Sequence, residues 1–319
     1  MTERTSRLSA VVPLGGAALI GVLTALQARV NGQLGLRLGD GFVAGAISFG
    51  SGLVLMVIVS AVVPAGRAGV ARLFSGVRDR SIPSWMLAGG AAGAFTVATQ
   101  GLAVAIIGVS LFSVGVVAGQ SVCALVLDRT GYGPAGQVAV TLPRVAGGLL
   151  ALVAVGISLS GGAGEAPVWM LVLPFLVGAG IGWQQATNGR LRARVGSPLT
   201  ATLVNFAGGT VVLLVAAVIH VAVVGPPAQL PPEPWLYLGG VVGVVYIFLS
   251  AALVSQTGVL LLGLGIVVGQ LGASVVLDAM WPAASGPDLG LELVTVLVAL
   301  AAVVVASARM PRRLRRPRG

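Results

Sequence analysis

Two pairs of amide side chains recur in the sequence with the same spacing. Gln27 precedes Asn31 by four residues, and Gln184 precedes Asn188 by four residues. On an α-helix this spacing places both amides of a pair on one face. The surrounding segments are apolar, and a polar group in a hydrocarbon environment needs a partner on a neighbouring helix, an ordered water or a bound solute. The pairs therefore indicate either interhelical hydrogen bonds or a pathway for a polar substrate.

A second set of polar residues accompanies glycines that also occur twice. Gln120 and Gln270 each follow a glycine in two similar apolar segments, and we predict that they line the same pathway. Glycines allow helices to approach each other closely. Four of them are interpreted as packing positions: Gly115, Gly119, Gly265 and Gly269.

Charged residues near the ends of apolar segments are the candidates for ion coupling. Asp128 and Asp278 each close a segment and are interpreted as capping or boundary charges rather than proton carriers. Arg144 lies inside a segment beside Pro143, where it reaches the surface, pairs with Asp128 or attracts an anionic substrate group. Glu292, early in the last segment, is a boundary residue or a coupling group. No acidic residue lies near the middle of a segment, so the coupling ion stays open.

The remaining reactive residue types form no catalytic or metal-binding pattern. The single histidine, His220, has no carboxylate near it in sequence, and no nucleophile motif or metal-ligand spacing is present. Gly-rich stretches such as LGGAALIG lack the strand context of a nucleotide-binding loop. The single cysteine, Cys123, excludes an intrachain disulfide. We therefore predict a protein that is not an enzyme and that binds no cofactor and no metal.

The composition predicts that these residues sit in a membrane protein. Of the 319 residues, 56% are hydrophobic and 9% are charged, whereas a soluble domain has about 25% charged residues. The mean hydropathy is +1.01. Apolar runs long enough to cross a hydrocarbon core of about 30 Å recur along the chain. They predict an all-α integral membrane protein with about ten transmembrane helices, at residues 9–30, 42–63, 84–107, 109–127, 137–159, 167–188, 199–224, 235–254, 258–277 and 289–308.

The arginines predict how these helices are oriented. The net charge of +10 does not indicate a nucleic-acid partner, because the arginines lie mostly in loops and at segment ends. With a cytoplasmic amino terminus, most arginines fall inside and only Arg29 and Arg37 fall outside. This bias predicts that both termini are cytoplasmic and that the number of spans is even. The basic tail at 309–319 is interpreted as an orientation anchor against anionic lipid.

An internal repeat divides the chain. QARVNGQLGLRLGDGFVAGAISFGSG at 27–52 returns as QQATNGRLRARVGSPLTATLVNFAGG at 184–209, with nine identities in 26 positions. GVSLFSVGVVAGQSVCALVLD at 108–128 likewise returns at 258–278. Because the order is preserved, the whole half is repeated. The first segment also has the basic-then-apolar form of a secretory signal, but residues running out of it recur, so we expect it to be retained.

The repeat predicts two five-helix halves, at 1–165 and 166–308, followed by the tail. An odd number of spans in each half gives the two copies opposite orientations across the membrane. Such inverted repeats are the architecture of many alternating-access transporters.

The motifs of the first half resemble a known family. GVLTALQARVNGQLG followed by AGAISFGSG, with GQSVCALVLDRTG later, is similar to the YdcZ-type branch of the drug/metabolite transporter superfamily. The resemblance spans nearly the whole chain twice, as in a fused pair of five-span relatives. It implies a ten-helix drug/metabolite transporter fold, a bacterial inner membrane and export of a small molecule. The family pattern carries over to Gln27, Asn31, Ser48, Phe49, Gln120 and Asp128, and to Gln184, Asn188, Phe206, Gln270 and Asp278.

One departure between the halves concerns the predicted pathway: the second half has Asn205 where the first has Ser48. Both belong to the predicted substrate-pathway residues, and the halves are expected to differ in function. Arg144 has no arginine equivalent in the second half.

Three hypotheses follow from the sequence. The leading one is a secondary transporter that exports a small metabolite by alternating access. An exporter of cationic drugs with the same fold should carry a buried carboxylate at a central cavity, but the first-helix glutamate of small multidrug exporters is absent here. A lipid-handling or structural membrane protein without a solute pathway should have a sealed, wholly apolar interface between its halves. The substrate, the coupling ion, the transport direction and the oligomeric state stay open.

Overall fold

The computed structural model describes residues 2–132, 137, 140–160, 168–227, 229–282 and 288–307, without the side chains of 2–14, 128, 158–160, 168, 171 and 250–264. All secondary structure in these residues is helical, as predicted. The elements are α1 (Thr2–Leu38), α2 (Gly41–Val62), α3 (Pro64–Arg78), η1 (Ser84–Leu87), α4 (Gly89–Thr99), the π-helical η2 (Gln100–Val104), α5 (Ala105–Ile107), α6 (Val109–Thr130), α7 (Leu142–Ser160), α8 (Val168–Val195), α9 (Pro198–Val224), η4 (Pro234–Tyr237), α10 (Gly239–Met280) and α11 (Leu289–Ser307).

Five stretches of the described helices are long and apolar enough to cross a membrane. They are Gly41–Val62, Ser84–Ile107, Val109–Leu127, Pro198–Val224 and Leu289–Ala306. Shorter apolar helical stretches occupy Leu142–Ile157, Gly239–Leu249 and Gly265–Met280. The membrane class of the chain is therefore supported by its helices, and the count of ten spans stays a prediction.

The same local chemistry ends the first helix of each half. Gly39 after α1 and Gly196 after α8 have φ angles of 64° and 62°, a left-handed conformation that glycine adopts without steric strain. The next residue in each case caps the following helix. Asp40 accepts hydrogen bonds from the N–H groups of Phe42 and Val43, and Ser197 accepts one from Thr200. One identity of the repeat, Gly39 with Gly196, and one pair of capping residues, Asp40 with Ser197, thus encode the same turn in both halves.

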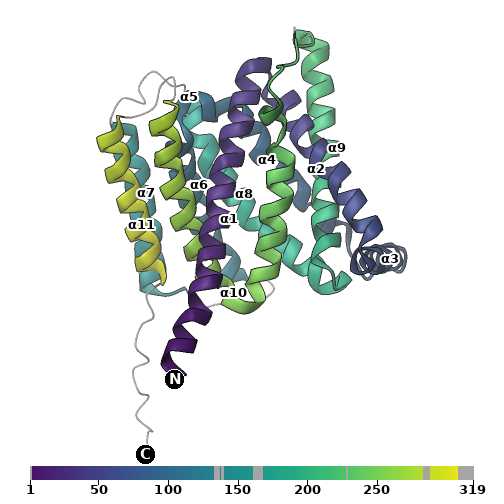
Figure 1. Cartoon of the computed structure of the whole chain (residues 1–319), viewed down its shortest axis with the longest axis horizontal. Helices are drawn as coiled ribbons and strands as arrows, with labels where there is room; N and C mark the ends of the chain where they lie inside the picture. The colour runs from purple at the N-terminus through teal and green to yellow at the C-terminus, as the bar shows by residue number, and fades with distance from the viewer. Residues whose placement is uncertain are drawn as a thin grey trace, which may run out of the picture.

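The predicted hairpins are formed in two different ways. Between the third and fourth predicted spans the helix breaks at Gly108, which has a φ of 86°. The eighth and ninth predicted spans lie within one element, α10. Tyr246, Leu249 and Ile266 of α10 all pack beside Ala17 and Ile20, which a straight helix rising about 1.5 Å per residue does not allow. The two arms of α10 therefore run back along each other (Figure 1).

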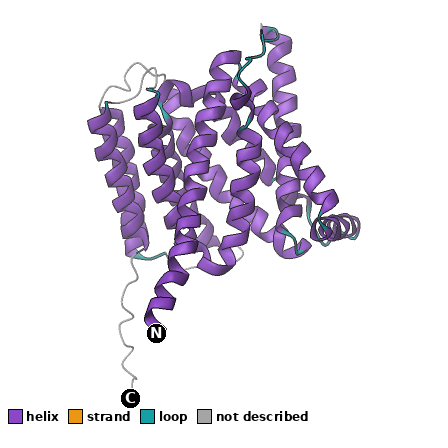
Figure 2. Ribbon diagram, viewed as in Figure 1, coloured by secondary structure: helices purple, strands orange, loops and turns teal. Residues whose placement is uncertain are grey.

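The helices of the two halves interleave. α1 packs along α10, α8 packs along α6 and α4, and α2 packs against α9. α7 and α11 form the pair at the side of the bundle (Figures 1 and 2). Asp40 before α2 contacts His220 near the end of α9, so these equivalent helices run in opposite directions. Neither half is a self-contained domain.

Glycines set a close crossing between α1 of the first half and α10 of the second. A Cβ added to Gly21 of α1 would overlap the carbonyl oxygen of Ile266, and a Cβ on Gly269 of α10 would overlap the carbonyl oxygen of Ala18. Only residues without a side chain allow this approach. The sequence interpretation of Gly269 as a packing position is confirmed by this contact.

The equivalent crossing, between α8 of the second half and α6 of the first, has the same two contacts. A Cβ on Gly178 of α8 would overlap the carbonyl oxygen of Val116, and a Cβ on Gly119 of α6 would overlap that of Phe175. Each residue occupies the repeat position of its counterpart in the α1–α10 crossing. The sequence repeat is therefore also a repeat of interhelical contacts.

Helix α3 was not predicted from the sequence, which indicated only an arginine-bearing loop at this place. It begins with Pro64, which suits the first helical turn. Figure 1 shows α3 nearly end-on, whereas the other long helices run lengthwise. Its small buried residues Gly66 and Gly69 face the bundle, and Phe74 is 72% exposed. The mixture of glycines, arginines and one exposed aromatic residue had hidden the helical period.

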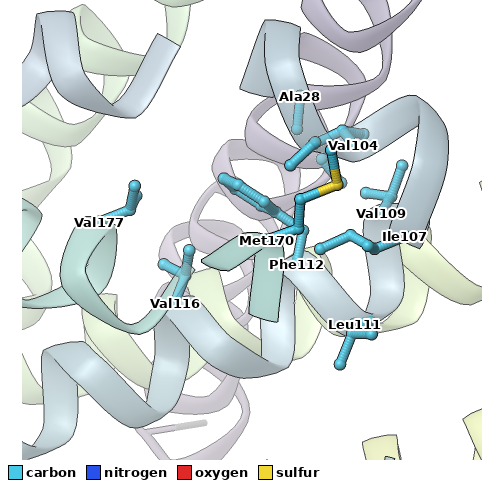
Figure 3. Close-up of a cluster of buried hydrophobic side chains, with 11 residues drawn as sticks. Ala28, Val104, Ile107, Val109, Leu111, Phe112, Val116, Met170 and Val177 are labelled. Carbon is cyan, nitrogen blue, oxygen red and sulfur yellow. The ribbon is translucent and has the colours of Figure 1, made fainter. Parts of the chain in front are cut away.

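A buried apolar cluster holds the π-helical segment in place. Figure 3 shows the side chains of Val104, Val109, Phe112 and Met170 converging from η2, α6 and α8. Ala28 of α1 joins the same cluster. The cluster fixes the part of the chain that carries Gln100 next to α1.

Candidate functional site

Two phenylalanines mark the centre of the interface between the halves. Phe49 of α2 and Phe206 of α9 are buried, with ring centroids 5.0 Å apart and planes tilted by 40°. Each ring lies over a glycine of the partner helix, Phe206 over Gly52 and Phe49 over Gly209. All four residues are identities of the sequence repeat, so the repeat also preserves this contact.

The first amide pair lies beside this centre and is buried. Gln27 donates through Nε2 to the carbonyl oxygen of Gly239, at 2.9 Å. Asn31 donates through Nδ2 to Oε1 of Gln100, at 2.7 Å. α1 thereby joins a helix of its own half to a helix of the other half.

The second amide pair converges on one acceptor. Gln184 Nε2 and Asn188 Nδ2 lie 2.8 and 3.1 Å from Oδ1 of Asn205, and both donate to it. These three residues come from α8 and α9 of the second half. Their amides face the start of α4 in the first half, since a Cβ on Gly89 or Gly93 would touch Asn188 or Gln184.

The two pairs are related by the pseudo-symmetry of the repeat. Gln27 and Asn31 face Gly243 and Gly239 of α10, just as Gln184 and Asn188 face Gly93 and Gly89 of α4. Each amide pair therefore packs against glycines of the other half, which leaves room for polar side chains between the helices. The candidate site comprises both pairs with Ser48, Asn205 and Gln100, and we call it the amide cluster.

The amide cluster is incompletely satisfied on one side. Asn31 Oδ1 and Ser48 Oγ are buried and have no hydrogen-bond partner. Both atoms lie against Gly239, where an added Cβ would come within 2.8 Å of Ser48 Oγ and closer to Asn31 Oδ1. At the equivalent place in the second half, Asn205 fills the space and accepts two bonds. The Ser48 hydroxyl and the side-chain carbonyl oxygen of Asn31 are therefore groups to which a water or a solute can hydrogen bond.

Sequence reasoning missed one member of the amide cluster, Gln100. Gln100 was not selected because it has no amide counterpart in the second half. It lies in a π-helical turn, a feature frequent at functional sites. The predicted pathway residues Gln120 and Gln270 are not brought to the cluster by any described contact. Gln270 instead donates through Nε2 to Ser113 Oγ, at 3.4 Å. Gln120 is half-buried in α6.

The candidate charged residues are arranged differently from the prediction. Arg29, expected in an outer loop, lies within α1 because that helix continues to Leu38, and it is buried beside Asp278 at 3.9 Å. Asp278 is a capping residue, but it caps α6 of the other half. Glu292 is buried in the first turn of α11.

The other two candidate charges give less information. Arg144, expected inside a span, stands in the first turn of α7 because that helix begins at Leu142. Its side chain is half-buried. The side chain of Asp128 lies outside the described residues, so its predicted pairing with Arg144 stays a prediction. The predicted basic tail falls within the undescribed residues 308–319.

Contacts between the halves close both ends of the bundle. At the end that carries α3 and the last turns of α6 and α8, here the arginine-rich end, Arg190 donates to the carbonyl oxygen of Gly131 at 3.0 Å and lies over the rings of Trp85 and Tyr132. Arg72 of α3 donates to the carbonyl oxygen of Val195 there.

At the opposite, arginine-poor end, His220 Nδ1 lies 2.8 Å from Asp40 Oδ2. The His220 pairing joins residues 180 positions apart and could not be inferred from sequence proximity. Arg37 pairs with Glu233 at 2.7 Å at the same end. The amide cluster thus lies between two closed ends.

The Arg37–Glu233 pair predicts a measurable pH dependence. Hydrogen bonds from its own backbone N–H and from the Arg37 guanidinium hold the pKa of Glu233 below its ordinary value of 4.5. A carboxylate with a lowered pKa stabilises the fold above its ordinary pKa, and this stabilisation is lost as the pH falls through the folded-state pKa. We expect Glu233→Gln to reduce the fall in melting temperature on acidification below pH 4.5.

The measurement is thermal unfolding in detergent across this pH range. Arg37→Gln should remove a smaller part of the pH dependence, because the hydrogen bond from the backbone N–H of Glu233 remains, and the double variant should add nothing to Glu233→Gln. Equal acid sensitivity of the wild type and Glu233→Gln would contradict a contribution of the pair.

Comparison with known proteins identifies the family. No curated protein matches the chain. A solved structure titled "Crystal structure of protein" aligns with 20% identity and a TM-score of 0.49, over 93% of this chain and 96% of its own. The family model described as "Putative inner membrane exporter, YdcZ" matches residues 12–158 and, a second time, residues 169–305. The chain therefore belongs to the YdcZ family of the drug/metabolite transporters, a family of inner membrane exporters, and carries two copies of its unit.

Proposed function

We propose that the protein is a secondary transporter that exports a small polar metabolite by alternating access. Its ten spans form two inverted five-helix repeats with both termini in the cytoplasm. The observation that carries the proposal is the amide cluster, built from both halves and enclosed between the two ends. Interhelical hydrogen bonds account for most of these amides, but not for Asn31 Oδ1 and Ser48 Oγ, which are buried without a partner and are costly in an apolar environment unless a water or a solute binds there.

Alternating access requires that one end open while the other stays closed. At the arginine-poor end, opening separates Asp40 from His220 and Arg37 from Glu233. At the arginine-rich end, it separates Arg72 and Arg190 from their carbonyl partners. All four contacts join residues of different halves, so rocking one half against the other breaks one set and keeps the other.

The distribution of arginines supports the orientation. Among described residues, the arginine-rich end carries those of α3 and its following turn and those that end α6 and α8: Arg67, Arg72, Arg78, Arg80, Arg129, Arg190, Arg192 and Arg194. Loops rich in arginine stay on the cytoplasmic side. The arginine-poor end then faces outward.

The chemistry of the amide cluster favours an uncharged polar solute. Its members are neutral, and its free acceptors are a carbonyl oxygen and a hydroxyl group. Such a site fits a hydroxyl or amide N–H donor. No described contact brings a carboxylate to the cluster, which disfavours the cationic-drug hypothesis. The polar interface likewise disfavours a purely structural or lipid-handling role.

A thermal-shift screen of the purified protein in detergent against metabolites and drugs tests this proposal. A ligand at 100 times its dissociation constant should stabilise the protein by about 2.7 kcal/mol. Gln27→Ala and Asn188→Ala should both lose the shift that a metabolite produces, each compared with its own unliganded melting temperature. Gln185→Ala is the matched control, because Gln185 adjoins Gln184 and is exposed.

The outcomes separate the hypotheses. A metabolite shift lost in both cluster variants and kept in Gln185→Ala supports one solute site made by both halves. A shift unaffected by either cluster variant would return these amides to helix packing. A response confined to lipophilic cations would favour the drug exporter.

A further inference from the structure

A buried charged cluster lies where α1, α6, α10 and α11 meet, apart from the amide cluster. It consists of Arg29, Ser110, Asp278 and Glu292. Arg29, Ser110 and Glu292 are buried, and the Asp278 side chain is 9% exposed. Charged groups are rarely taken out of water without a specific role.

Asp278 is held as an anion by three contacts. Its two carboxylate oxygens accept hydrogen bonds from the backbone N–H groups of Val109, at 3.0 Å, and Ser110, at 2.7 Å. These groups form the first turn of α6, where the helix dipole favours a negative charge. Arg29 Nη1 lies 3.9 Å from Asp278 Oδ1.

Glu292 lacks such support and adjoins Asp278. Its carboxyl group accepts a hydrogen bond from the Ser110 hydroxyl. Ser110 contacts both carboxyl groups, because its backbone N–H donates to Asp278 and its hydroxyl donates to Glu292. Two buried carboxylates held against one residue repel each other, and a proton bound by one of them relieves this repulsion, as in the paired carboxyls of other proteins.

We propose that Asp278 and Glu292 share one exchangeable proton. The charge balance is the reason: two carboxyl groups face a single guanidinium group, so one bound proton makes the buried cluster neutral. Proton release leaves a carboxylate on Glu292, and proton uptake restores the acid. The hydrogen-bond donors on Asp278 favour the form in which the proton lies on Glu292.

Two polar groups near the pair can hold a water that passes a proton to or from it. Arg29 Nη1 and Thr295 Oγ1 are buried without a hydrogen-bond partner, and Thr295 follows Glu292 by one turn on α11. The facing groups are Arg29 from α1, the Ser110 hydroxyl from α6 and Asp278 from α10. Arg144 lies in the first turn of α7, whereas Glu292 lies in the first turn of α11.

The repeat does not reproduce the cation of this site. The repeat equivalent of Arg29 is Ala186, so the second amide pair has no such cation beside it. The site lies close to Gly108 and the start of α11, at the arginine-poor end. Resting on the proposed function, this places a single proton site near the outward face, where a proton exchanged for an exported solute would enter.

Infrared difference spectroscopy of the purified protein tests the site without any transport substrate. We expect a carboxylic-acid C=O band at neutral pH that corresponds to one protonated carboxyl per chain. Glu292→Gln and Asp278→Asn should each abolish the band, because the remaining carboxyl then pairs with Arg29 as an anion. Glu233→Gln is the control, since Glu233 is already an ion-paired carboxylate, and it should leave the band unchanged.

A band that persists in either of the two pair variants would overturn the shared proton, as would its absence from the wild type. Ser110→Ala provides a second test if a pair variant fails to fold. It should keep the band but shift its frequency, because the hydrogen bond to Glu292 is lost, and an unshifted band would again contradict the site. A wild-type band without any metabolite response would leave this proton site standing while refuting the proposed export.

Discussion

Gly269→Ala is expected to unfold the protein at a much lower temperature than the wild type, with a loss of about 3 kcal/mol or more in stability. A Cβ at this position overlaps the backbone of Ala18 in α1. Backbone atoms cannot move aside as a flexible side chain does, so α1 and α10 must separate. Because the amide pair of α1 contacts the other half only through α10, separation would also disturb the amide cluster.

A neighbouring glycine gives a matched control for this prediction. Gly272 lies three residues later in the same helix, and nothing lies within 4 Å of a Cβ added there. Gly272→Ala should be neutral or slightly stabilising, because alanine favours the helix by about 1 kcal/mol. Thermal unfolding and size-exclusion chromatography in detergent measure both variants. Equal stability of the two would show that the crossing is looser than described.

The second large effect is expected at Asn205, and it should differ in kind from the effect at Ser48. Asn205→Ala removes the acceptor of both Gln184 and Asn188. Two amide donors then lack a partner at a largely buried position, which we expect to cost about 2 kcal/mol of stability. Ser48→Ala removes a hydroxyl that has no partner, so stability should not fall.

Ser48→Ala should affect ligand binding although it does not affect stability. If the free acceptors of Ser48 and Asn31 contact the solute, Ser48→Ala should weaken the metabolite-induced thermal shift while keeping the unliganded melting temperature. Ser51→Ala is a control, because Ser51 lies on the same helix and its hydroxyl already donates to the backbone carbonyl oxygen of Ser48. A full thermal shift in Ser48→Ala would exclude Ser48 from the solute site.

The parts of the fold that could be predicted are those encoded locally. Apolar runs indicated the helices, and the glycine and cap residues of the repeat correspond to observed turns. Identities at positions such as Gly52, Phe49 and their equivalents Gly209 and Phe206 are explained by one symmetric contact. The repeat was visible because both copies preserve the same steric requirement.

What sequence could not supply was long-range pairing. His220 meets Asp40, and Glu292 meets Ser110 across 182 positions. Such pairs depend on how the two halves interleave, which no local pattern records. Gln100 was missed because it has no amide counterpart in the second half, so the repeat gave no signal for this member of the cluster.

The interleaving of α1 with α10 has a consequence for biogenesis. Gln27 and its acceptor Gly239 are separated by 212 residues. At a synthesis rate of about 5–20 residues per second, α1 is made roughly 10–40 s before that partner exists. During this interval its amide face and Arg29 must be sheltered by the insertion machinery or by water near the lipid surface. α1 is thus made long before the helix that it packs along, and chain termination before α10 leaves Gln27 without its acceptor.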